Sequence, residues 1–320
     1  MKKIWIFLWI VCCALYSSCS LLEVEPVSTI TSQSFWKNSG DAKAYLTGIY
    51  NKVRALNNTS LYGEDRGDAF KVGEIGPSTN AWAQNLLENN APSYQDAYNI
   101  IHHTNLLLYK IDGLSFTNEA DKNRIKAETY YLRAQTYFFL VRIWGDVPIL
   151  LDPVLSDKIE LKPRSPKEEV MKQILSDIEQ SLSLFPEEGF VNKNYSSKPA
   201  AYALKADALL WKAKVLSGGD SDLNEAVNAI NEVEKSGVEL LPEYASVFNN
   251  ANKRNAEIIF SLYFERYETG NLSIATNTTS RTDNLSMAVN LDEAATSPNQ
   301  SRHVYAPSEK TRVLYLKYPG

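Results

Sequence analysis

The sequence predicts a mainly α-helical fold, an α–α superhelix of tetratricopeptide-like hairpins with irregular loops and a few short strands. Three observations support this fold class. Apolar residues recur at helical spacing over several long segments. The string Ser165-Pro166-Lys167-Glu168 combines a capping Ser, a Pro at the first helical position and a Glu three residues after the cap. Residues 199–236 read as one helical hairpin of about the length of a tetratricopeptide unit.

The first three helices are expected over residues 41–56, 94–111 and 123–144. The first two each carry an apolar stripe at helical spacing, which predicts one buried face. The third is apolar nearly all round between Tyr130 and Leu140. We therefore expect neighbouring helices to pack against several of its sides.

The fourth helix is expected over residues 165–185, with Ser165 as its N-cap and Pro186 ending it. Its apolar residues recur every four positions, which predicts one buried stripe. They are Val170, Ile174, Ile178 and Leu182. This helix could pair with 123–144 to form a second hairpin.

The hairpin at 199–236 is expected to join a helix over 199–216 to another over 223–236, through a turn at 217–220. Asp222 is the predicted N-cap of its second helix. Paired helices of this kind usually stack and present a surface to a partner protein.

Other stretches do not read as helix. Residues 57–74 are polar and contain glycine, and residues 145–162 combine prolines with extended apolar residues. Residues 257–264 alternate between polar and apolar like a strand. Residues 268–300 are rich in Ser, Thr and Asn, which is typical of loops.

The N-terminus reads as a secretion signal over residues 1–18. Two lysines precede an apolar run over 4–16. This run of about 13 residues is shorter than the ~20 residues that a membrane-spanning helix needs. The small residues Ser17 and Ser18 stand directly before Cys19. This pattern resembles a lipobox and predicts cleavage before Cys19 and attachment of lipid to it. The alternative is an uncleaved anchor in which Cys19 is an ordinary residue.

Cysteine usage and charge agree with an exported protein. The chain has three cysteines, and Cys12 and Cys13 lie in the signal, so the domain expected over 19–320 can form no internal disulfide. Removing the signal changes the net charge from −5 to −7, because Lys2 and Lys3 are its only charged residues. A mildly acidic chain without a Lys/Arg cluster argues against nucleic acid as a partner and against electrostatic docking on anionic lipid.

The sequence contains no catalytic, metal-binding or cofactor-binding constellation. His102 and His103 are adjacent within a predicted helix, where they point about 100° apart and cannot both ligate one ion. His303 is isolated, and a Gly-rich phosphate loop is absent. We therefore expect a protein that is not an enzyme and that needs no metal or cofactor.

Several strings, taken in order, resemble the SusD/RagB family of outer-membrane nutrient-binding lipoproteins. The most distinctive is Ala127-Glu128-Thr129-Tyr130-Tyr131-Leu132-Arg133-Ala134, which continues into 140–148. The other matching strings lie at 22–26, 35–36, 41–42, 48–50, 64–68, 164–170, 257–261 and 307–310. Members are usually longer, so the resemblance implies that a C-terminal part of the domain is missing from this chain.

The resemblance implies a lipid-anchored protein on the outer face of the outer membrane. Such proteins form a lid over a TonB-dependent, SusC-like β-barrel transporter and capture oligosaccharides. Their helical repeats pack on the barrel side, and loops form the ligand site. Some branches capture peptides instead. A further alternative is an adaptor that uses its helices only to hold other envelope proteins.

Sugar rings stack their apolar faces on aromatic side chains, and their hydroxyl groups pair with amides, carboxylates and guanidinium groups. The best local match is residues 80–85, in which Trp82 stands between Asn80 and Asn85. The resemblance implies the same use of a Trp with an Asn three residues later. The alternative is that Trp82 packs into the core.

Two further sets of residues are candidates for ligand contact. Arg66 and Asp68 either line the same pocket or brace their loop by a salt bridge between them. The second set is Tyr263 with Arg266 and Tyr267, at the end of the strand-like run and just past it, and we expect Tyr267 to be the exposed one.

Overall fold

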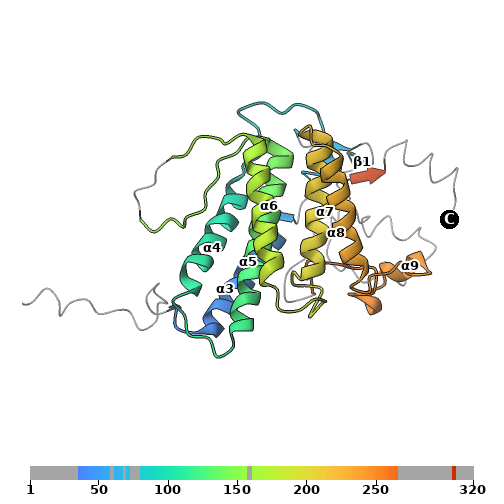
Figure 1. Ribbon diagram of the computed structural model, residues 1–320. Coiled ribbons are helices and arrows are strands. Elements are labelled where there is room, and N and C mark those ends of the chain that lie inside the picture. The colour runs from blue at the N-terminus through green and yellow to red at the C-terminus, as the bar shows by residue number, and fades with distance from the viewer. Residues whose placement is uncertain are drawn as a thin grey trace, which may run out of the picture.

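The computed structural model describes residues 35–57, 61–67, 70–72, 80–156, 161–265 and 305–307. In this part of the chain the long helices lie side by side (Figure 1). They are α3 Ser39–Asn57, α4 Gln95–Ile111, α5 Glu119–Trp144, α6 Lys167–Leu184, α7 Lys198–Val215 and α8 Asp220–Glu234. The expected mainly α-helical superhelix is confirmed, and its helices begin and end within four residues of the predicted bounds.

Short elements complete the described structure. They are the 3-10 helices η1 Glu64–Arg66 and η2 Asn250–Asn252, the single turn α9 Tyr244–Val247, and the strands β1 Phe70–Val72 and β2 Tyr305–Pro307. The two strands pair antiparallel, with Lys71 opposite Ala306. None of the described helices is long and apolar enough to cross a membrane.

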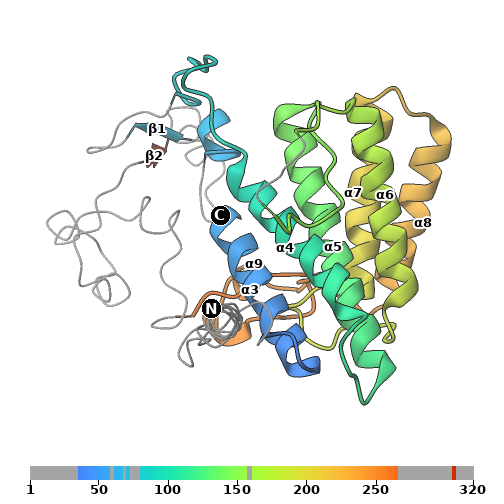
Figure 2. The ribbon, with the colours of Figure 1, turned by 90° about the vertical axis from the view of Figure 1, so that its left-hand side faces the viewer.

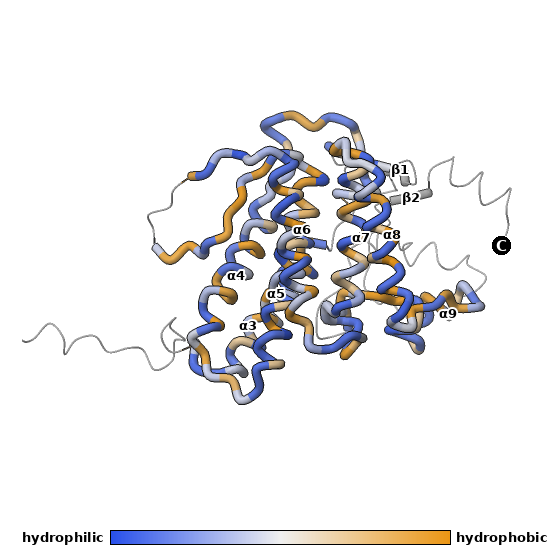
Figure 3. The backbone as a smooth tube through the Cα atoms, in the orientation of Figure 1, coloured by the Kyte–Doolittle hydropathy of each residue, from blue (hydrophilic) through white to orange (hydrophobic). Residues whose placement is uncertain are grey.

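Helix α5 is the centre of the stack. It packs against α6 along most of its length and also against α3 and α4, while α7 packs between α6 and α8. Both predicted hairpins, α5–α6 and α7–α8, are therefore formed. Figure 3 shows hydrophilic and hydrophobic residues alternating along the helices, as expected of helices with a buried and an exposed side.

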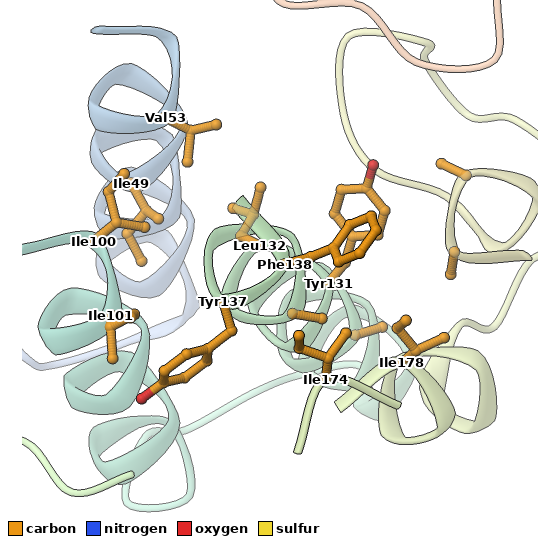
Figure 4. Packing of buried hydrophobic residues seen from close by; sticks show 14 of the residues in the cluster. Ile49, Val53, Ile100, Ile101, Tyr131, Leu132, Tyr137, Phe138, Ile174 and Ile178 are labelled. Atoms are coloured by element: carbon orange, nitrogen blue, oxygen red, sulfur yellow. The ribbon is translucent and has the colours of Figure 1, made fainter. Parts of the chain in front are cut away.

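The core lies around the middle of α5, as its nearly uniform apolar character predicts. Tyr137, Leu132 and Leu140 are fully buried there. Figure 4 shows Leu132 and Tyr137 of α5 between two groups of residues. Ile49 of α3 and Ile101 of α4 lie on one side, and residues of α6 lie on the other. The α6 residues are Val170, Ile174, Ile178 and Leu182, so the predicted stripe is buried as expected.

Two predicted helix caps are wrong. Helix α6 starts after Pro166, and Ser165 instead donates its backbone N–H to the carbonyl of Val147 at 3.0 Å. The carboxylate of Asp146 accepts from the first helical N–H of Lys167 at 2.9 Å, so a residue distant in sequence does the capping. Asp222 lies inside α8, where its carboxylate accepts from Lys212 Nζ at 2.6 Å.

The strand predicted over 257–264 is also wrong. These residues lie in the described part of the chain but form no regular element. Their backbone meets an irregular loop, where the N–H of Ser261 donates to the carbonyl of Lys193 at 2.9 Å. Apolar residues of this segment are nevertheless partly buried, because Ile259, Phe260 and Leu262 pack against the core.

A buried ion pair joins three helices at the centre of the stack. Arg133 of α5 donates from Nε and Nη2 to the two carboxylate oxygens of Asp177 on α6, at 2.8 and 2.7 Å. Its Nη1 donates to Asn105 of α4 at 2.9 Å. Asn105 in turn donates to the carbonyl of Leu150, which holds the segment after α5. All three polar side chains are buried.

Candidate functional site

Except for Tyr263, the predicted site residues that the structure describes lie at one end of the stack. They lie in residues 61–67 and 80–94, which together we call the loop face. Figure 2 shows the segment 80–94 beyond the start of α4, on the side of β1 and away from α7 and α8. The loop face thus uses irregular backbone carried by rigid helices, which is common for binding sites.

Aromatic rings attach the loop face to the helices. The ring centroid of Tyr62 lies 5.0 Å from that of Phe139 and 5.6 Å from that of Trp144. Tyr94 meets Trp144 edge to face at 5.8 Å. Each such pair contributes about 0.5–1.5 kcal/mol beyond its buried area. Both halves of the loop face are therefore fixed to the same end of α5.

The predicted amides are brought together by a closed turn over 80–85. The backbone N–H of Asn85 donates to the carbonyl of Asn80 at 2.9 Å, and that of Gln84 donates to Ala81 at 3.2 Å. Gln84 has a φ of 55°, in the left-handed region that such tight turns require. The side chains of Asn80 and Asn85 are exposed, while Ala81 is buried and anchors the turn.

Trp82 is half-buried in this turn and makes contacts within the structure. Trp82 is not among the buried residues of the described core, and its contact with a ligand stays a prediction. Trp82 stands between the two exposed amide residues in this turn. The arrangement offers an aromatic surface with hydrogen-bonding groups beside it.

Arg66 is the last residue of η1 and is exposed on the same loop face. The pKa of the Tyr62 phenol is raised, mainly by burial. The charge of Asp96 raises this pKa further, and the charge of Arg66 lowers it. Arg66 therefore lies within electrostatic reach of the aromatic rings that hold the loop. Its neighbour Asp65 is buried, and neither of its carboxylate oxygens has a hydrogen-bond partner within the described part of the chain, a costly arrangement that the sequence does not predict.

The remaining candidates are not brought into this group. Asp68 and Tyr267 lie outside the described residues, so the pairing of Arg66 with Asp68 and the exposure of Tyr267 stay predictions. Tyr263 lies elsewhere, beside α3, where its carbonyl accepts from Arg54 Nη1 at 3.2 Å.

The sequence reading also missed a buried polar cluster near the start of α5. Glu128 is buried there and accepts from the Tyr50 hydroxyl at 2.7 Å. That hydroxyl in turn accepts from the backbone N–H of Ser196 at 2.8 Å. Burial raises the pKa of Glu128 to about 7. Lys126 and Arg133 stand in the same stretch of α5, so the local sequence does not mark Glu128 as a buried acid.

Comparison with known proteins identifies the family. Residues 22–210 match the SusD-like family described as starch-binding and associating with the outer membrane. The SusD-like protein P25 of Formosa agariphila is 28% identical over 286 residues, which cover 82% of this chain and 51% of that protein. The chain therefore spans about half the length of this curated relative.

Solved structures agree with the sequence match. B. fragilis NanU is 30% identical with a TM-score of 0.68, over 81% of this chain and 54% of that protein. A laminarin-binding SusD-like protein is 25% identical with a TM-score of 0.62, over 70% of this chain and 51% of that protein. The family match covers more than half of the present sequence, and the helical stack is shared. This chain belongs to the SusD-like family of starch-binding proteins that associate with the outer membrane.

Proposed function

We propose that this chain captures oligosaccharides at the cell surface and delivers them to a SusC-like TonB-dependent transporter in the outer membrane. The observation that carries the proposal is the closed turn at 80–85, which presents the half-buried Trp82 between the exposed amides of Asn80 and Asn85. The family description and the laminarin-binding relative support glycan as the ligand class. Binding, rather than catalysis, is the proposed activity.

The geometry of the loop face suits an uncharged, hydroxyl-rich ligand. The indole of Trp82 would stack on the apolar face of a sugar ring, while the amides donate to and accept from its hydroxyl groups. The turn is closed by its own backbone hydrogen bonds, so less conformational freedom would be lost on binding. Arg66 would add a charged donor at the edge of the same face.

Replacing Trp82 with alanine is expected to weaken glycan binding by about 1–3 kcal/mol, the range measured for stacking of planar bases on aromatic side chains. The measurement is affinity electrophoresis and calorimetry with soluble starch and with laminarin as probes. Tyr109→Ala is the matched control, because Tyr109 is an exposed aromatic residue near the far end of α4. It should bind like the unmodified protein.

The outcomes of this screen separate the alternatives. Unchanged binding by Trp82→Ala to a glycan that the unmodified chain binds would remove Trp82 from the site. Binding to a peptide library and to no glycan would replace the proposal with peptide capture. Absence of any small ligand, with retention of an envelope partner, would favour an adaptor.

Lipid attachment at Cys19 is the second part of the proposal that can be tested. Cys19→Ala is expected to abolish incorporation of a labelled fatty acid and to release the protein from the membrane fraction of the producing bacterium. Cys12→Ala and Cys13→Ala are matched controls, because both cysteines lie in the predicted signal. Labelling that survives Cys19→Ala would contradict the anchor. Surface exposure of the anchored protein is checked separately, by protease accessibility on intact cells.

A further inference from the structure

A cavity of about 330 Å³ opens between α3, α5 and the segment that joins α6 to α7. Leu46, Ile125 and Phe185 form its apolar wall, and Glu128 and Ser196 lie among its polar residues. Glu128 precedes Trp144 by 16 residues on α5, or about 24 Å along a helix. The cavity is therefore separate from the loop face. Its size is at the lower end of the range for small-molecule sites.

The acid in this cavity lacks a cationic partner. Within the described part of the chain, Glu128 forms no ion pair and accepts a hydrogen bond from Tyr50. The nearest guanidinium, that of Arg124, is held by Glu187 and by Asp121, the latter at 3.1 Å. A buried carboxylate is expensive to ionise unless a cation or several hydrogen bonds compensate it.

The charges that line the cavity besides Glu128 balance one another. Lys43 also lines the cavity, but it pairs with Asp121 at 3.3 Å. With Arg124 likewise engaged, the two bases are neutralised by Asp121 and Glu187, and Glu128 remains as the unmatched charge. When Glu128 is ionised, the lining therefore carries one net negative charge and favours a cation over an anion.

We propose that this cavity binds a small organic cation, a primary ammonium group carried on an apolar body of about the size of one ring. The ammonium would donate to the carboxylate of Glu128 and to the hydroxyl of Ser196, two residues that line the cavity. The apolar body would cover Leu46, Ile125 and Phe185. An anion would be repelled by the carboxylate of Glu128. A polyol would not cover the apolar wall.

The electrostatics of Glu128 agree with this ligand. Its pKa is about 7, because burial outweighs the hydrogen bond from Tyr50 and the attraction of Arg124, while Glu187 adds repulsion. Of the other charged groups at the cavity, Lys43 and Asp121 compensate each other. An ammonium beside the carboxylate favours its ionised form. Binding is therefore expected to release a proton near neutral pH and to strengthen as the pH rises from 6 to 8.

The test compares benzylamine with its neutral analogue benzyl alcohol, by calorimetry on the full chain at pH 8. Benzylamine is expected to bind at least about tenfold more tightly than benzyl alcohol, since only the amine can compensate the acid. Equal affinities, or no binding of benzylamine, would overturn the proposal. The comparison uses the unmodified protein, so it does not depend on the folding of a variant.

Two variants then place the ligand. Glu128→Gln keeps an acceptor for Tyr50 but removes the charge, and it is expected to weaken benzylamine about tenfold or more while leaving benzyl alcohol unchanged. Val191→Trp fills the opening at a residue that is 68% exposed, and it should weaken both ligands. Glu188→Gln is the control, because Glu188 is exposed and lies outside the cavity lining. Full benzylamine affinity in either Glu128→Gln or Val191→Trp would contradict the assignment.

Discussion

Replacing Asp177 with alanine is expected to destabilise the folded chain by about 3–5 kcal/mol, because it leaves the guanidinium of Arg133 buried and without its counter-charge. Arg133 and Asp177 are 7% and 2% exposed, and both carboxylate oxygens accept from the guanidinium. The hydrogen bond from Arg133 to Asn105 cannot replace the lost charge. The measurement is the free energy of unfolding from urea denaturation.

The matched control is Asp207→Ala on α7. Asp207 also pairs with an arginine, Arg142 at 3.4 Å, but both side chains are about half exposed. Exposed pairs contribute about 0–1 kcal/mol, so this variant should change the free energy of unfolding little. Equal losses for Asp177→Ala and Asp207→Ala would show that burial does not determine the strength of the central pair.

Glu128→Gln is expected to remove a pH dependence of stability that amounts to about 3 kcal/mol between pH 4.5 and 8. Burial raises the pKa of Glu128 from 4.5 to about 7 in the folded chain, so folding favours its protonated form. That contribution to stability is fully present below pH 4.5 and is lost as the pH rises through about 7. At pH 8 the variant should therefore be at least as stable as the unmodified chain.

The measurement is the free energy of unfolding at pH 5 and at pH 8, for both proteins. Burial lowers the pKa of His103 to about 4, so this residue contributes with the opposite sign over the same interval. Subtracting the unmodified chain from the variant at each pH cancels that contribution. Glu188→Gln, at an exposed glutamate, should show no such difference. A variant that follows the unmodified pH curve would rule out Glu128 as its source.

The helices could be predicted because their signal is local. The apolar stripe in 165–185 and the apolar residues around Tyr137 directly indicate which helix faces are buried. The cap of α6 could not be predicted, because Asp146 reaches it from 21 residues away. The strand predicted over 257–264 is wrong for a related reason. A pattern of polar and apolar residues indicates which side chains are buried, but a strand also needs a neighbouring strand to pair with.

The candidate site was predictable only in part. The grouping of Asn80, Trp82 and Asn85 follows from their spacing, because a turn brings neighbours in sequence together. The cluster of Glu128 with Tyr50 and Ser196 joins residues that are 78 and 146 positions apart from Tyr50. Such a contact forms only when the helices have stacked. It therefore cannot be predicted from the spacing of these residues in the sequence.

The unequal packing of the helices has a consequence for local opening of the fold. Helix α8 packs chiefly on α7, whereas α5 is held by α3, α4 and α6. Within the described residues, separating α8 breaks chiefly its interface with α7, so we expect its amide hydrogens to exchange with solvent through fraying of the α7–α8 hairpin alone. The amides in the middle of α5 exchange only when the whole stack unfolds. Since the loop face is attached at the end of α5, it remains ordered while α8 frays.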